Sequence, residues 1–204
     1  RTVSSAASDV YKRQVYQYLL DTLLGFNMSG IINATNLEVA NIKDSTGTNT
    51  AMTIDSSGRI LTPQRPAFRV NVASSQSMNT NEVAVLFADN GTSLNNFLLG
   101  GITISNGVIT VPVSGLYCFS TVIRANSIGS GFATAKIRRN SMTDGQAGTY
   151  IIIGNNRSTD YDNLSGSTVF NMNANDTVRV EMKTSADSSW TVDIRSEFSG
   201  YLIG

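Results

Sequence analysis

Core-facing and polar residues alternate along most of the chain after Pro66. The positions on the core side are Phe68, Val70 and Val72; Val83, Val85 and Phe87; Ile109, Val111 and Val113; Tyr117, Phe119, Thr121 and Ile123; Val178, Val180 and Met182; and Trp190, Val192 and Ile194. The residues between them are mostly polar. Because successive side chains of a strand point to opposite faces, this period of two predicts half-buried β-strands that share one core.

Turn signals separate these runs. Asn106-Gly107, between two apolar runs, is the most specific of them, since a tight two-residue hairpin needs residues that tolerate positive φ. The others are Asp89-Asn90-Gly91, Ser114-Gly115, Asp144-Gly145 and Asn173 to Asp176. Short strands at this spacing, without a helical pattern between them, predict an all-β sandwich or barrel.

Residues 28–65 form a shorter and more polar segment. Asp44-Ser45-Thr46-Gly47 recurs as Asp55-Ser56-Ser57-Gly58, and both are turn signals. The strand-like pieces around them, residues 37–42, 51–54 and 60–61, are too short to bury a core alone. We expect either a β-rich stem that pairs with copies of itself or a flexible linker.

The first residues look like a sequencing artefact. Ser4 to Gln14 resembles a translated library adaptor, so residues 1–14 are left out of the fold prediction, and the chain is expected to come from a metagenomic read. Two interpretations stay open for residues 15–27, a short apolar helix or a continuation of the artefact. Met28 is expected to be the native start.

Composition narrows the function classes. The 204 residues carry 15 basic and 15 acidic side chains, no histidine and one cysteine. Zero net charge gives no electrostatic basis for nucleic-acid binding, and we interpret the one basic cluster, Lys136, Arg138 and Arg139, as a solvated strand face. The lack of histidine removes the commonest general base, which predicts a protein that is not an enzyme. No apolar run reaches the ~18 residues of a membrane span, so no membrane insertion is expected.

Four segments resemble, in the same order, the globular head of complement C1q. Their sequences are Pro66-Ala-Phe68; Gly107-Val-Ile-Thr-Val-Pro-Val-Ser-Gly-Leu-Tyr-Cys-Phe-Ser120; Leu164 to Val180, with Asp176 in a turn; and Glu197-Phe-Ser-Gly-Tyr-Leu-Ile203. The resemblance covers Pro66 to Gly204. It implies a ten-stranded antiparallel jelly roll of the C1q and tumour-necrosis-factor type, assembled as a homotrimer for recognition. Asn175 stands where the family often has glycine, and asparagine tolerates the same left-handed backbone.

The implied trimer suggests an interface, and the polar loops suggest a recognition surface. The candidate interface residues are Phe68, Tyr117, Phe198 and Tyr201, although Tyr117 and Phe198 also fit simple core packing. The candidate recognition residues are Asp89, Asn90, Asn95, Asn96, Asn155, Asn156, Asp160 and Asp162. We interpret the Asp160 and Asp162 pair as solvated loop residues rather than a cation or glycosidase site. No catalytic residue and no cofactor are predicted. Some family members bind calcium near the trimer axis, but no calcium ligands map onto this sequence.

The resemblance and the polar stem lead to one functional expectation and one alternative. Ala51 to Ile60 looks like stretches that precede such heads in marine phage proteins. We therefore expect a tail fibre or other virion appendage whose head contacts a glycan or protein on the host surface. The alternative is a secreted or surface-bound bacterial adhesin with the same head, located outside the cell or on the bacterial surface.

Overall fold

The computed structural model describes residues 40–43, 46–88, 96–126, 132–142, 149–155, 161–185 and 190–204. The predictions for residues 1–27 and for the start at Met28 lie outside these residues. All regular structure in the described part is β-strand, which confirms the all-β prediction. No described helix is long and apolar enough to cross a membrane.

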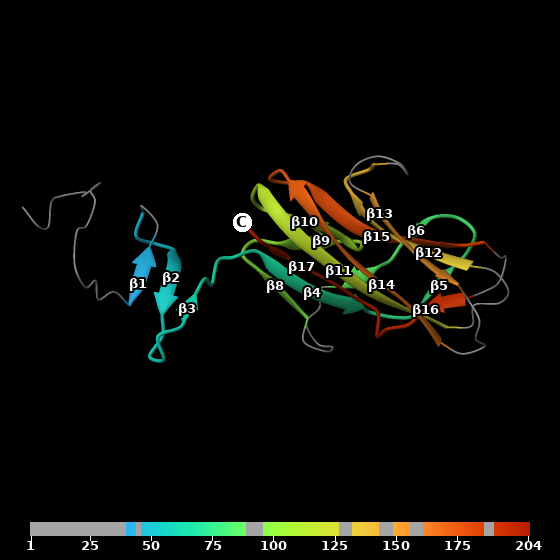
Figure 1. Ribbon diagram of the computed structural model, residues 1–204, viewed down its shortest axis with the longest axis horizontal. Coiled ribbons are helices and arrows are strands. Elements are labelled where there is room, and N and C mark those ends of the chain that lie inside the picture. Colours follow the sequence, from blue (N-terminus) through green and yellow to red (C-terminus); the bar gives the residue numbers. More distant parts are fainter. Residues whose placement is uncertain are drawn as a thin grey trace, which may run out of the picture. The chain divides into compact units, whose positions relative to one another are not determined.

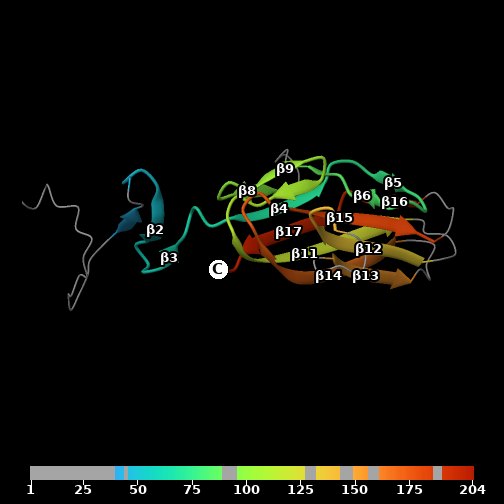
Figure 2. The same cartoon turned by 90° about the horizontal axis from the view of Figure 1, so that it is seen from above.

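Two antiparallel sheets form the head (Figure 1, Figure 2). The described part of the first sheet has eight strands, with β14-β11-β17-β4-β8 side by side at its centre. Its strands are β4 (Ala67–Val72), β5 (Gln76–Met78), β7 (Phe87–Ala88), β8 (Phe97–Leu99), β11 (Gly115–Asn126), β14 (Tyr161–Met172), β16 (Trp190–Val192) and β17 (Glu197–Leu202).

The second sheet of the head has six described strands in the order β13-β12-β15-β10-β9, with β6 also paired to β15. They are β6 (Val83–Ala84), β9 (Thr103–Ser105), β10 (Val108–Thr110), β12 (Phe132–Arg139), β13 (Thr149–Asn155) and β15 (Thr177–Thr184). Ahead of the head, a separate three-stranded sheet consists of β1 (Asn41–Lys43), β2 (Thr50–Ile54) and β3 (Ile60–Leu61).

An aromatic cluster fills the space between the two sheets of the head. The rings of Phe68 and Phe198 meet edge to face with centroids 5.1 Å apart, and Phe119 packs against both. Gly200 belongs to this cluster because a Cβ there would lie 2.7 Å from ring atoms of Phe68 and Phe119. Most positions predicted for the core side are buried. The exceptions are Val83, which is half-buried, and Val113 and Ile194, which are exposed beyond the ends of β10 and β16.

The run from Val83 to Phe87 is not one strand, as its alternation predicts, but a crossover between the sheets. β6 pairs with β15 of the six-stranded sheet, whereas β7 pairs with β4 of the eight-stranded sheet. The Gln76 side chain replaces a strand partner at this point: it donates to the Ala84 carbonyl and accepts from the Leu86 amide, both at 2.8 Å. Alternation is a local signal, so it cannot show which sheet a strand joins.

Two asparagine turns have the backbone that the sequence predicts. Asn106 and Gly107 both have positive φ, 48° and 76°, as the tight hairpin requires. Asn175 has φ of 69°, so asparagine does adopt the left-handed conformation in the turn before β15. Asp176 closes that turn by accepting hydrogen bonds from the Asn173 amide at 2.9 Å and the Asn140 side chain at 3.0 Å.

This turn predicts a pH-dependent contribution to stability. The Asn173 amide, then the Asn140 side chain and the charge of Arg139, lower the pKa of Asp176 below its usual value. A lowered folded-state pKa stabilises the fold above the unfolded pKa of about 3.9, and this contribution is lost as the pH falls through the folded value. We expect Asp176→Asn to cost roughly 1 kcal/mol at pH 7 in urea unfolding. A difference that persists unchanged well below the folded pKa would contradict this.

Candidate functional site

The outer face of the eight-stranded sheet carries an apolar row that runs across five strands. Pairing places Val169 opposite Cys118, Cys118 opposite Tyr201, Tyr201 opposite Ala67, and Ala67 opposite Leu99. Directly paired residues of antiparallel strands point to the same side, so these five side chains form one line. We call it the cross-strand apolar row.

The apolar row is exposed in a single chain. Val169 and Tyr201 are each 52% exposed and Leu99 is 48% exposed, while Cys118 and Ala67 are half-buried. Hydrogen bonds place Ile203 beside Leu116, and both of these side chains are also exposed. Contiguous apolar surface of this kind marks contact with another molecule more often than it marks a solvated face.

The row next to it is polar. Ser167, Ser120, Ser199 and Arg69 pair in sequence across β14, β11, β17 and β4, ending at Phe97 of β8. Arg69 forms an ion pair with Glu197 in which Nη2 and Oε2 are 2.7 Å apart. The outer face therefore combines an apolar line with a hydrogen-bonding border, which is the usual composition of a protein interface.

Three of the four predicted interface residues lie elsewhere. Phe68, Tyr117 and Phe198 are at most 1% exposed and face the second sheet, so the core-packing interpretation holds and their assignment to an interface is wrong. Tyr201, one residue after Gly200 of the core, points the opposite way and lies in the apolar row. Sequence reasoning missed Val169, Cys118 and Leu99. Residues 116–119 are all apolar, so both faces of this part of the strand carry apolar side chains, and this was a usable signal.

The predicted recognition residues lie largely outside the part of the chain that the structure describes. This holds for Asp89, Asn90, Asn95, Asn156 and Asp160. Asn155 ends β13 and Asp162 lies within β14, so these two residues, expected in polar loops, belong to strands. Asn96 is half-buried and its side-chain amide donates to the Ala88 carbonyl at 3.1 Å, which ties β7 to the start of β8.

Charged side chains occupy the outer face of the six-stranded sheet. Lys136 and Arg138 are 2% and 7% exposed, so their interpretation as a solvated strand face is wrong. Glu82 forms ion pairs with both, and its Oε2 lies 3.0 Å from Nη2 of Arg138. Glu181 pairs with Arg138 at 3.0 Å and with Arg179 at 2.6 Å. The pairs of Glu82 attach the segment before β6 to the sheet.

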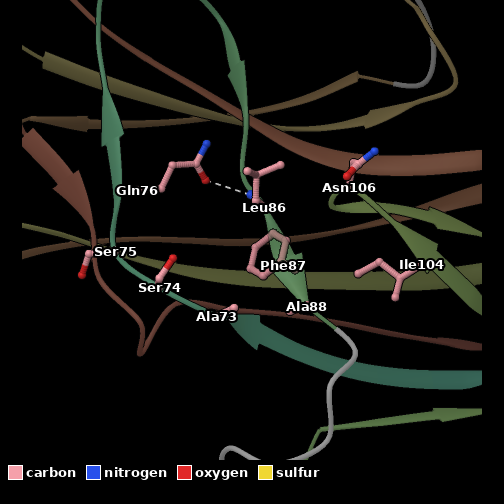
Figure 3. A pocket seen from close by; sticks show the side chains of 9 residues that line it. All are labelled: Ala73, Ser74, Ser75, Gln76, Leu86, Phe87, Ala88, Ile104 and Asn106. Carbon is pink, nitrogen blue, oxygen red and sulfur yellow. Dashed lines mark hydrogen bonds between the residues drawn. The ribbon is translucent and has the colours of Figure 1, made fainter.

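A surface pocket of about 560 Å³ lies beside the crossover between the sheets (Figure 3). Its lining contains no acidic, basic or histidine side chain and consists of Ala73, Ser74, Ser75, Gln76, Leu86, Phe87, Ala88, Ile104 and Asn106. The Gln76 amide is already bonded to the backbone of Ala84 and Leu86. Hydroxyl groups without a neighbouring base do not make a nucleophile, so the described residues of this pocket form no catalytic arrangement.

The two sheets define a jelly-roll domain in which the eight-stranded sheet carries an exposed apolar row on its outer face. The family model for the C1q domain matches residues 67–203, and the chain belongs to this family. The structure resembles murine APRIL, with 14% identity, a TM-score of 0.51 and coverage of 68% of this chain and 98% of that one. It also resembles the globular domain of zebrafish complement 1qA, with 18% identity, a TM-score of 0.51 and coverage of 69% and 98%. At these identities the likeness shows the fold alone. No curated protein matches the sequence.

Two glutamates with arginine partners should differ strongly in their contribution to stability. Glu181→Gln removes the carboxylate charge from a side chain that is 8% exposed. Arg138 and Arg179 then lose their ion pairs with this residue. We expect a loss of about 3 kcal/mol in the free energy of unfolding, measured in urea at fixed protein concentration. Glu197→Gln is the matched control, since its side chain is 29% exposed, and should cost less than about 1 kcal/mol. Equal losses would show that burial does not set the strength of these pairs.

Proposed function

We propose that this chain is a non-enzymatic recognition module that works as a homotrimer through the cross-strand apolar row. The observation that carries the proposal is that Val169, Cys118, Tyr201, Ala67 and Leu99 form one apolar line on the face opposite the core. The family resemblance supplies the number of copies. Tyr201 is still 52% exposed in one chain, so about half of the ~150–250 Å² that an aromatic side chain can bury remains for an interface.

The position of the row supports contact between copies around an axis. It extends from β14, at one side of the central strands, to β8 at the other. One copy can therefore use the β14 end of its row against the β8 end of the next, which is a head-to-tail contact that closes into a ring. The serine and Arg69 border beside the row can then form hydrogen bonds at the edge of the interface.

A trimer would give recognition its strength. The polar loops that connect the strands are repeated three times on one particle, so weak contacts to a repetitive surface add without new chemistry. Asparagine, serine and aspartate in these loops suit hydrogen bonding to glycans or polar protein surfaces. We propose that the surface is that of a bacterial host and that the module belongs to a phage tail fibre or another virion appendage.

The location in a virion can be tested on the natural source. The microbial community that contains this gene can be separated into a virus-particle fraction and a bacterial-envelope fraction. Mass spectrometry should then find peptides from residues 66–204 in the virus-particle fraction. Recovery only with bacterial envelopes would contradict the virion assignment and favour the adhesin alternative. The trimer prediction is independent of this result.

A charge placed in the row should break the trimer. Tyr201→Asp puts a carboxylate at a site that is 52% exposed in one chain, where a neighbouring copy would have to desolvate it. We expect light scattering to find a trimer for the unaltered chain and a monomer for this variant. The thiol of Cys118, next to Tyr201 in the row, should also react faster with a maleimide in the variant.

Leu86→Asp is the matched control for this experiment. Leu86 is 49% exposed and lies at the crossover pocket rather than in the row, so the same change should leave the trimer intact. A trimer that survives Tyr201→Asp, or that is lost equally in Leu86→Asp, would contradict the assignment of the interface to the row.

A further inference from the structure

The small sheet ahead of the head has one apolar face. Pairing places Ile42 opposite Met52 and Ile54 opposite Ile60, and Met52 and Ile54 are two residues apart on β2. All four side chains therefore point to the same side. The opposite side carries Asn41, Thr53 and Leu61, and the Thr53 hydroxyl donates to the Asn41 side chain at 2.8 Å.

This apolar face is uncovered within the described part of the chain. Ile42 is 42% exposed, Ile54 is 38% exposed and Ile60 is 65% exposed. The three strands have three, five and two residues, so the sheet is too small to shield its own apolar face from water. An amphipathic sheet of this size is stable when its apolar face packs against another surface.

The charges near the sheet leave the face free for an apolar partner. Asp55 and Arg59 form an ion pair at 2.7 Å in the turn between β2 and β3, and Asp55 also accepts from the amides of Ser57 and Arg59. The face itself consists of uncharged side chains, those of Ile42, Met52, Ile54 and Ile60. Lys43, the charged residue at the end of β1, is exposed and pairs with Thr50 after a register shift, so its ammonium group can stay in water at the margin of such a contact.

The short connection to the head favours copies of the same sheet as the partner. β3 ends at Leu61 and β4 begins at Ala67, so only residues 62–66 intervene, a span below about 20 Å. Arg65 shortens the free part further, because its Nε donates to the Leu202 carbonyl of the head at 2.7 Å. In a trimer of heads, three such sheets are held together at an effective concentration on the order of millimolar.

We propose that the Ile42, Met52, Ile54 and Ile60 face binds the same face of the other copies and forms a three-fold β-stem. The number of copies rests on the proposed homotrimer. Three sheets that meet by their apolar faces leave the Asn41, Thr53 and Leu61 sides in water. This arrangement accounts for a segment that combines a polar composition with a line of isoleucines.

Site-directed cross-linking tests the stem in the full chain. With the native Cys118 kept, so that the proposed head interface is unchanged, Ile54→Cys places a thiol on the apolar face, Thr53→Cys places one on the opposite face of the same strand, and the unaltered chain measures any cross-linking by Cys118 itself. Under mild oxidation we expect disulfide-linked dimers on non-reducing gels from Ile54→Cys, at least tenfold more than from Thr53→Cys. Adding Ile60→Asp to Ile54→Cys should abolish the cross-link, whereas adding Leu61→Asp, the adjacent residue on the polar face, should not.

The outcomes separate the stem from the head. If light scattering finds a trimer but position 54 does not cross-link, or cross-links no better than position 53, the stem inference is overturned and the head trimer stands. Equal effects of Ile60→Asp and Leu61→Asp also overturn the stem. A monomer overturns the stem inference and the proposed function together.

Discussion

The proposed association depends on one constraint: the eight-stranded sheet carries apolar side chains on both of its faces, a core on the inner face and a single exposed row on the outer face. Its inner face presents Phe68, Phe119 and Phe198, which the six-stranded sheet covers. Its outer face presents the cross-strand apolar row, which one chain cannot cover with its own second sheet. An antiparallel sheet can leave one face in water, but an exposed apolar row on that face favours contact with another surface. We therefore propose that the domain associates through this row.

The outer faces of the two sheets of the head differ in their side chains, since one carries an apolar row and the other carries charged residues. The outer face of the six-stranded sheet holds Lys136, Arg138 and Glu181 in ion pairs with little exposed surface, and Glu82 joins them with a side chain that is 30% exposed. Buried ion pairs are costly to desolvate further, so this face is a poor site for a tight apolar contact. The small sheet also exposes apolar side chains, but mainly on one side: Ile42 and Ile60 line that side and Thr53 lies on the other.

The sequence allows the fold to be predicted because alternation reports which residues share a face. Phe68, Val70 and Val72 are buried as expected, and Asn106 and Asn175 adopt the left-handed turns. Alternation does not say what each face contacts. Phe198 and Tyr201 are both aromatic, yet their different parity puts one in the core and the other on the surface. The crossover at Val85 and the burial of Lys136 depend on contacts between distant segments, which no local pattern contains.

The central claim is that the apolar row is a subunit interface, and the mass of the unaltered chain in solution tests it most directly. Sedimentation equilibrium measures that mass without a label or a substitution. The account predicts a single species of about three times the 21.8 kDa of one chain, stable on dilution into the micromolar range. A species of 21.8 kDa under the same conditions would mean that the row stays in water, and it would contradict the account.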